Sequence, residues 1–286
     1  MADRRGNSTE AYGLMAPALG VMAIGLIAPL ALMLVTSFQS QSGSGFAAGW
    51  TLAQYGAVLG RESYRILFLR SLLISGAVTL VTVALAYPAA YYVAFHARRK
   101  FVWLVALTIP FWTSYLLRVF AWKIILGFNG LINSGLIRLH LIHQPLSFLL
   151  YNPFAVVVTL AHAWAAFAIL PIYVSLEKID RALLEAASDL GDGPLRRFLR
   201  ITLPLSMPGI VGAAILIFVP TTGDYVTPAL VGGTQGSMIA NLIEVQFVGA
   251  GNWPLGAALS VAGMVLVGLI AGLFVTAARA AAKAAR

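Results

Sequence analysis

The chain alternates long apolar stretches with shorter polar ones. Apolar residues dominate six stretches, which run over residues 13–37, 66–95, 101–126, 153–176, 208–232 and 255–278. Each exceeds the roughly 20 mostly apolar residues that an α-helix needs to cross the hydrocarbon core of a bilayer. The pattern therefore predicts an all-α polytopic membrane protein with about six transmembrane helices.

The composition agrees with this prediction and excludes a soluble domain. Hydrophobic residues make up 60% of the 286 residues and charged residues only 10%, and the mean hydropathy is +0.87. Soluble globular domains carry about 25% charged residues. We expect one transmembrane domain over residues 13–278, with a polar N-terminus over 1–12 and a basic tail over 279–286.

Basic residues gather in particular connections between the predicted spans. They occur at both ends of the chain, at residues 98–100 and in the loop over residues 178–207. Because cytoplasmic loops carry an excess of Lys and Arg, we expect both termini and this loop to be cytoplasmic. The net charge of +9 thus follows from membrane topology and requires no nucleic-acid partner.

The loop over residues 178–207 is a charged island between two apolar stretches. Its charges and backbone groups would go unsatisfied in hydrocarbon, so it must lie in water or against another protein. Helical periodicity predicts a short amphipathic helix that ends near Gly191, and Pro194 suits the first turn of a second, basic helix. We therefore predict two short helices joined by a sharp turn.

The same loop carries a spaced motif, with Glu-Ala-Ala at 185–187, then Gly191, then Ile-x-Leu-Pro at 201–204. This spacing resembles the EAA loop of permease subunits of bacterial ABC importers. The resemblance implies a coupling helix that contacts an ATPase subunit, where Glu185 would face a basic residue. The alternative is an interfacial loop whose arginines touch lipid headgroups. The residues implied in ATPase coupling are Glu185, Ala186, Ala187, Gly191, Leu195, Ile201, Leu203 and Pro204.

The fifth predicted span contains Pro220 and Pro228, which we expect to break or kink it. Non-helical backbone within a membrane is tolerated only where protein buries it or where it lines a watery cavity. Asp224 lies in this interruption and is a candidate for a translocation path, because a carboxylate within a membrane is expensive and usually functional. The alternative is that Asp224 neutralises Arg118 or Lys123 of the third span.

Residues 118–122, 223–233 and 252–258 are similar to the polyamine branch of these permeases. The resemblance implies a spermidine/putrescine permease of the bacterial inner membrane that works by ATP-driven alternating access. It also implies three kinds of partner: a second related permease, two copies of an ATPase, and a periplasmic or lipid-tethered polyamine-binding protein. ATP and Mg²⁺ would be used by the ATPase, so we expect no cofactor in this chain, where no Lys follows a Gly as in a phosphate-binding loop.

A polyamine is a string of ammonium groups separated by methylenes, so its path should offer carboxylates and aromatic faces. The candidates for the substrate path are Asp224, Tyr225, Trp122, Tyr115, Arg118 and Glu244. However, Arg118 and Lys123 would repel a cation if they faced the path, and they would favour an anion importer. Importers of opines, thiamine, iron or sulfate therefore stay as alternatives, as does a secondary transporter that works without ATP.

Metal and enzyme chemistry have little support. His140 and His143 are spaced to share a metal ion, but no carboxylate accompanies them between residues 129 and 152. The Gly-x-Ser-x-Gly and His-Glu-x-x-His patterns do not occur, and the chain has no cysteine. We therefore predict a transport subunit, with no metal site and no catalytic residues.

Overall fold

The computed structural model describes residues 6–42, 45–47 and 49–284 of the chain, and the side chains of 15–41 and 49–277. In this part of the chain, six helices are long and apolar enough to cross a membrane, which confirms the predicted all-α membrane fold. They are Met15–Ser37, Glu62–Phe95, Tyr115–Arg138, Pro153–Glu177, Pro194–Thr222 and Trp253–Ala277. The predictions for residues 1–5 and 285–286 concern residues outside the described part of the chain.

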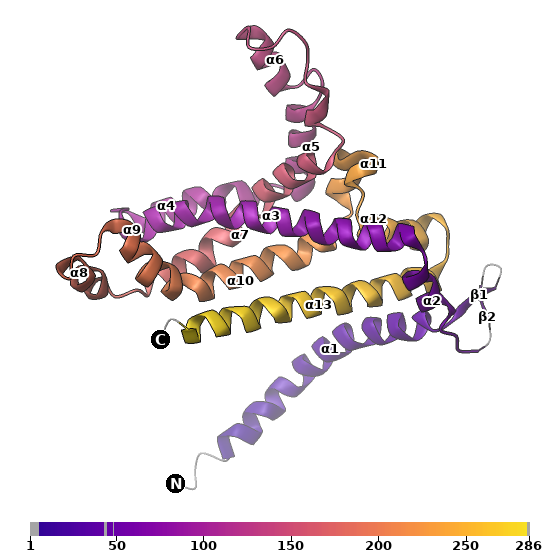
Figure 1. Cartoon of the computed structure of the whole chain (residues 1–286). Helices are drawn as coiled ribbons and strands as arrows, with labels where there is room; N and C mark the ends of the chain where they lie inside the picture. The colour runs from indigo at the N-terminus through magenta and orange to yellow at the C-terminus, as the bar shows by residue number, and fades with distance from the viewer. Residues whose placement is uncertain (1–5, 43–44, 48, 285–286) are drawn as a thin grey trace. The chain divides into compact units, whose positions relative to one another are not determined.

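The elements are labelled in Figure 1 in chain order. The α-helices are α1 (Gly6–Ser37), α2 (Ala53–Gly60), α3 (Glu62–Phe95), α4 (Lys100–Thr108), α5 (Tyr115–Leu126), α6 (Leu131–Arg138), α7 (Pro153–Glu177), α8 (Arg181–Asp189), α9 (Pro194–Arg197), α10 (Leu203–Thr222), α11 (Gly233–Gly236), α12 (Ile239–Glu244) and α13 (Trp253–Ala284). The strands are β1 (Ser40–Ser42) and β2 (Gly45–Ala47). Two 3₁₀ turns, η1 (Ile109–Trp112) and η2 (Ser147–Leu149), and three π-helical turns, η3 (Phe198–Thr202), η4 (Pro228–Gly232) and η5 (Val245–Gly249), complete the order.

The chain forms two compact units. One contains residues 1–62 and 243–264, and the other contains residues 63–242 and 265–286. In the first unit, β1 and β2 pair antiparallel, and the side-chain amide of Gln41 donates a hydrogen bond to the carbonyl of Gly251 at 2.9 Å. The hydroxyls of Ser37 and Tyr55 lie 2.7 Å apart and join the end of α1 to α2.

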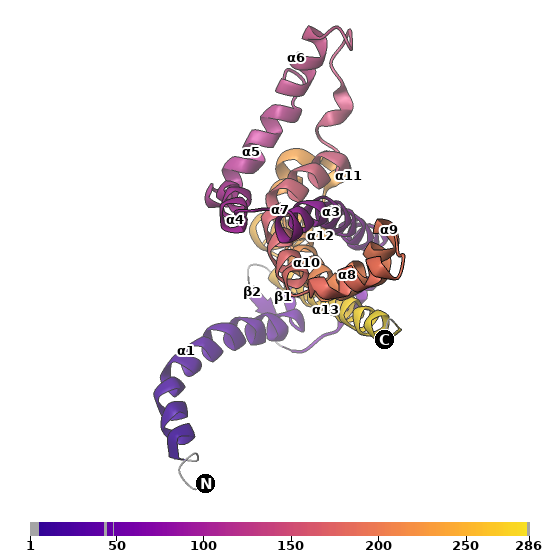
Figure 2. The same cartoon turned by 90° about the vertical axis from the view of Figure 1, so that its left-hand side faces the viewer.

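The second unit is built around α3, α7 and α10, which run beside one another in Figure 1 and are seen nearly end-on in Figure 2. Their facing sides supply the buried core, which includes Val78, Leu160, Ile172 and Ile217. α7 and α10 approach closely at Gly209, where an added Cβ would lie 2.5 Å from the carbonyl oxygen of Pro171 and 2.5 Å from the Cβ of Ser175. Small residues at such a contact let two membrane helices approach closely.

The predicted third span over residues 101–126 is wrong as a single helix. The structure has a shorter apolar helical segment over Lys100–Trp112 and a separate candidate span that begins at Tyr115. The 3₁₀ turn contains Pro110, which lacks the N–H for an α-helical bond, and Thr113 Oγ1 donates to the carbonyl of Pro110 at 2.7 Å. Ser114 then takes an extended conformation, with φ −55° and ψ 135°, so α5 begins in a new direction.

The fifth span is interrupted, as predicted, but the interruption lies between the two prolines. The helix runs through Pro220 and ends at Thr222, followed by Gly223. Pro228 lies in the first turn of η4, where a missing backbone N–H costs little.

The predicted second short helix of the 178–207 loop is not separate. Helical backbone continues from Pro194 through η3 into α10. In η3 the backbone N–H of Leu203 donates to the carbonyl of Phe198, five residues earlier. This wider turn precedes Pro204, whose ring would clash with the carbonyl four residues before it in a regular α-helix.

We predict that Gly209→Ala destabilises the second unit, because the new methyl group has no room between α7 and α10. Overpacking of this kind costs about 1–3 kcal/mol. Gly212→Ala is the matched control, since its Cβ would meet only the Cβ of Pro171, at 4.0 Å. Thermal unfolding in detergent should show a lower midpoint for Gly209→Ala alone; equal midpoints for the two variants would contradict the close packing.

Candidate functional site

The loop over residues 178–207 is built around α8, which has a defined cap at each end. The carboxylate of Asp180 accepts a hydrogen bond from the backbone N–H of Ala182 at 3.0 Å. At the other end, the N–H of Gly191 donates to Ser188 and the N–H of Asp192 donates to Ala187, each at 2.9 Å. These two bonds form a Schellman cap, which places Gly191 at φ +84°.

Two polar contacts tie the end of α8 to the helix that follows. The guanidinium of Arg197 donates to the hydroxyl of Ser188, and Arg200 lies 3.6 Å from the carboxylate of Asp192. Arg197 and Arg200 both lie in the continuous helix that leads into α10. Two contacts therefore join the turn to the helix that leads into α10.

The loop exposes apolar side chains in spite of its charge. The leucines involved are Leu183, Leu190 and Leu195, which are 49%, 87% and 69% exposed. Exposed apolar groups that cluster on a polar surface are typical of protein–protein contacts. The loop thus offers an apolar surface with basic residues beside it.

The sequence-predicted coupling residues lie along α8 and the start of the next helix. Glu185 and Ala186 are exposed on α8, whereas Ala187 is buried and accepts one of the cap bonds. Leu195 is exposed on α9. The three remaining residues, Ile201, Leu203 and Pro204, are half-buried at the junction of η3 and α10.

An aromatic contact joins this junction to α3. The ring of Phe198 lies 5.7 Å from that of Tyr87 and 6.4 Å from that of Tyr91, both in edge-on arrangements. The hydroxyl of Tyr87 lies 2.9 Å from that of Ser206, which is buried in α10. The loop is thereby connected to two spans, directly to α10 and through these rings to α3.

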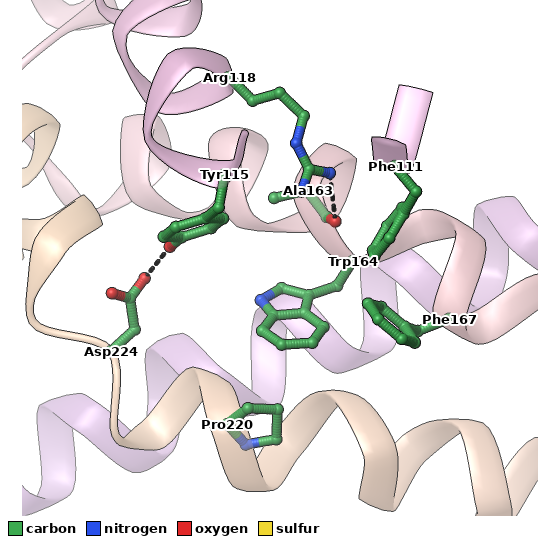
Figure 3. Close-up of a pocket in the computed structure, with 8 residues that line it drawn as sticks. All are labelled: Phe111, Tyr115, Arg118, Ala163, Trp164, Phe167, Pro220 and Asp224. Atoms are coloured by element: carbon green, nitrogen blue, oxygen red, sulfur yellow. Dashed lines mark hydrogen bonds between the residues drawn. The ribbon is translucent and has the colours of Figure 1, made fainter. Parts of the chain in front are cut away.

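A cavity of about 380 Å³ lies in the second unit. Figure 3 shows the side chains that line it. They come from η1, α5, α7, α10 and the residues just after α10, and they are Phe111, Tyr115, Arg118, Ala163, Trp164, Phe167, Pro220 and Asp224. The cavity therefore combines four aromatic rings with one carboxylate and one guanidinium.

Asp224 is the acidic group of this cavity. Its Oδ2 accepts a hydrogen bond from the hydroxyl of Tyr115 at 2.5 Å, and that hydroxyl also lies 2.5 Å from Thr227 Oγ1. Its Oδ1 accepts from the backbone N–H of Val226 at 2.9 Å. The carboxylate thus satisfies a backbone N–H at the start of the helical segment that follows α10, and it also faces the cavity.

Arg118 is the basic group of the cavity and is not paired with Asp224. One of its terminal nitrogens donates to the carbonyl of Ala163 at 3.0 Å, and the guanidinium carbon lies 4.6 Å from the centre of the Phe111 ring. Lys123 instead lies over the ring of Tyr151, at 5.9 Å. Within the described residues, neither cation lies within 4.0 Å of the Asp224 carboxylate, so the alternative of a neutralising pair is not formed.

The structure brings together Tyr115, Arg118 and Asp224, but not the other predicted path residues. Trp122 packs on the core, with its ring 5.5 Å from that of His162, and Tyr225 is 49% exposed. Glu244 ends α12 and belongs to the other compact unit. Among the described residues, no three His, Asp or Glu side chains gather as a metal site would require.

Sequence reasoning missed the aromatic part of the cavity. Trp164 and Phe167 lie on α7, and Phe111 lies in η1 before α5. The rings of Phe111 and Phe167 are 4.2 Å apart, and those of Trp164 and Phe167 are 5.2 Å apart. A tryptophan amid apolar residues of a span could have been noticed, since a buried indole N–H usually needs an acceptor.

Comparison with known proteins gives concordant results. Residues 27–283 match the model of a family described as "Binding-protein-dependent transport system inner membrane component". The chain is similar to the spermidine/putrescine transport system permease protein PotB of Escherichia coli (strain K12), with 35% identity over 255 residues, covering 88% of this chain and 92% of that protein. It is 34% identical over 246 residues to the PotB protein of Haemophilus influenzae, covering 86% of each chain.

A solved structure shares the fold. It is a chain of a bacterial alginate ABC transporter in complex with alginate pentasaccharide-bound periplasmic protein. The TM-score is 0.76, and the likeness covers 97% of this chain and 96% of that one. The sequence identity is 15%, so this likeness concerns the fold alone.

We predict that Gly191→Ala loosens the end of α8. A non-glycine residue at a positive φ costs about 1–2 kcal/mol, and the open space around this residue does not change that cost. Gly193→Ala is the matched control, because Gly193 is equally uncrowded but has φ −66°. Amide hydrogen exchange at Asp192 should become roughly tenfold faster in Gly191→Ala only; unchanged exchange would contradict the cap.

Proposed function

Because the chain belongs to the family of binding-protein-dependent transport system inner membrane components, we propose that it is the transmembrane permease subunit of an ABC importer for polyamines. The relatives that cover most of its length are named spermidine/putrescine permeases. The observation that carries the proposal within this chain is the cavity at which Asp224 and Tyr115 meet. A carboxylate beside aromatic rings suits an ammonium group on a methylene chain.

The proposed assembly contains a second related permease, two copies of an ATPase and an extracytoplasmic polyamine-binding protein. The chain is a multi-pass protein of the bacterial inner membrane, with both termini and the 178–207 loop in the cytoplasm. In this arrangement the polar residues 1–12 and the basic tail 279–286 flank the transmembrane domain 13–278. ATP and Mg²⁺ are used by the ATPase, and this chain holds no cofactor of its own.

The proposed coupling runs through one continuous helix. The exposed leucines and Glu185 of the loop contact the ATPase, and closure of the ATPase dimer moves α8. The turn at Gly191 is held by its backbone cap and by the ion pair between Arg200 and Asp192. The motion of α8 therefore passes into the helix from Pro194 to Thr222, which has 29 residues. A helix of that length spans about 43 Å, and it ends two residues before Asp224.

The proposed transport cycle is alternating access. ATP binding closes the ATPase dimer and opens the path toward the loaded binding protein, and hydrolysis returns the path to the inside. Displacement of α10 relative to α5 and α7 changes access to the cavity that these helices border. The family resemblance and the continuous helix support this cycle.

We expect Glu185→Arg to separate ATP hydrolysis from transport, because the reversed charge would disturb the contact with the ATPase. Polyamine uptake by the reconstituted complex should fall at least about tenfold while the permease still inserts, since a charge-assisted contact contributes roughly 1.5–3 kcal/mol. Glu62→Arg makes the same charge change at the opposite end of α3 from the loop and should transport normally. Wild-type uptake by Glu185→Arg would refute the coupling role.

We expect Asp224→Asn to reduce spermidine uptake by roughly tenfold or more, because the variant loses the charge that attracts an ammonium group. The amide oxygen of Asn can still accept from Val226, so insertion should persist. Tyr115→Phe keeps the ring and removes only the hydroxyl, and its effect should be smaller. If the two variants were equally impaired, or if Asp224→Asn failed to assemble, the carboxylate would be structural.

A further inference from the structure

Two hydrogen-bond donors of the cavity are left without an acceptor. In the described part of the chain, four buried side-chain polar atoms have no partner, and two of them, Arg118 Nε and Trp164 Nε1, belong to residues that line this one cavity. Buried donors without an acceptor are rare in folded proteins and call for a specific explanation. Both of these atoms are closed to solvent, but Arg118 also has a terminal nitrogen that makes no hydrogen bond to the described residues and is not buried, so an acceptor bound in the cavity could reach the guanidinium there.

No acidic side chain of the described residues neutralises the positive charge of Arg118 at the cavity. The guanidinium is held by the carbonyl of Ala163 at 3.0 Å and by the face of Phe111 at 4.6 Å. Within the described residues, no Asp or Glu oxygen lies within 4.0 Å of it. Neither of its partners carries a formal charge, so Arg118 presents an uncompensated cation with unused N–H donors.

The opposite end of the cavity carries a negative charge and hydrogen-bond acceptors, whereas the Arg118 end carries a positive charge and donors. Asp224 supplies an anionic acceptor, and Tyr115 lies between it and Arg118 in Figure 3. The same view shows the nitrogen of the Trp164 ring turned toward the side where Tyr115 and Asp224 lie. An ammonium group therefore suits the Asp224 end, whereas a second ammonium group would meet the like charge of Arg118.

We propose that the cavity prefers an amine that carries one ammonium group and, across a short methylene chain, one carbonyl-type acceptor. The ammonium group binds at Asp224 and Tyr115, the methylenes lie against the rings of Trp164 and Phe167, and the acceptor binds the guanidinium of Arg118. N-acylated diamines and ω-amino acids share this chemistry. The inference rests on the proposed function and narrows it from polyamines in general to amines whose second nitrogen is masked or replaced by an acceptor.

The test compares competitors of similar length on the complete complex. The permease, its partner permease and the ATPase are placed in lipid nanodiscs, and bound labelled putrescine is displaced by N-acetylputrescine, by 4-aminobutyrate or by n-butylamine. n-Butylamine carries one ammonium group and no acceptor, so it separates the effect of the acceptor from the loss of a charge. We expect N-acetylputrescine, 4-aminobutyrate or both to displace the label at roughly tenfold lower concentration than n-butylamine.

Variants then assign the preference to the donors. Arg118→Met should reduce the preference for acceptor-bearing amines to within about twofold of n-butylamine and should bind putrescine more tightly, because a repulsive charge is removed. Arg118→Lys keeps the positive charge but loses the planar set of N–H donors, so it should lose part of the preference, which provides a second test if Arg118→Met assembles poorly. Lys123→Met removes a cation of the same helix that does not line the cavity, and it should leave the preference unchanged.

The outcomes separate this inference from the proposed function. If putrescine binds but acceptor-bearing amines compete no better than n-butylamine, or if Arg118→Met and Arg118→Lys keep the full preference, the inference is overturned and the polyamine proposal stands. If no labelled amine binds to the complex, both are overturned. A preference for the amide supports acylated diamines as the substrate class, and a preference for the carboxylate supports ω-amino acids.

Discussion

The end of α10 at Gly223 is the constraint on which the rest of the second unit depends. Interrupted helical backbone between apolar segments needs hydrogen-bond partners that lipid cannot supply. Asp224 supplies an acceptor for the backbone that follows the break, since its Oδ1 accepts from the N–H groups of Val226 and Thr227. Its Oδ2 accepts from the side-chain hydroxyl of Tyr115, which holds the carboxylate in place. The same carboxylate faces the cavity, so the group that stabilises the break also gives the cavity its acidic end.

One continuous helix connects the 178–207 loop to the cavity. A helix that begins at Pro194 and ends at Thr222 joins them without an interruption, and the π-helical turn η3 keeps it continuous before Pro204. Phe198 contacts α3 within that turn. A movement of α8 can therefore change both the position of α10 and its packing on α3, which is what an ATP-driven permease requires.

The sequence predicted the fold and the loop cap well, because both follow from local rules. Long apolar runs predicted the spans, and Gly191 was expected to end α8 because glycine adopts a positive φ. The break at Thr113 and Ser114 was missed, although Pro110 just before it is the same signal that indicated an interruption in the fifth span. The contact between Tyr115 and Asp224 joins residues 109 positions apart, and nothing local indicates it. Trp164 was missed because it resembles a packing residue until the cavity beside it is known.

The most direct test of the account is uptake of labelled putrescine into proteoliposomes that contain this chain, its partner permease and the ATPase. The binding protein is added outside, and ATP is enclosed. The account predicts accumulation that requires both ATP and the binding protein. Uptake that proceeds equally without ATP would contradict it, because the chain would then transport its solute without the coupling that the 178–207 loop is proposed to provide.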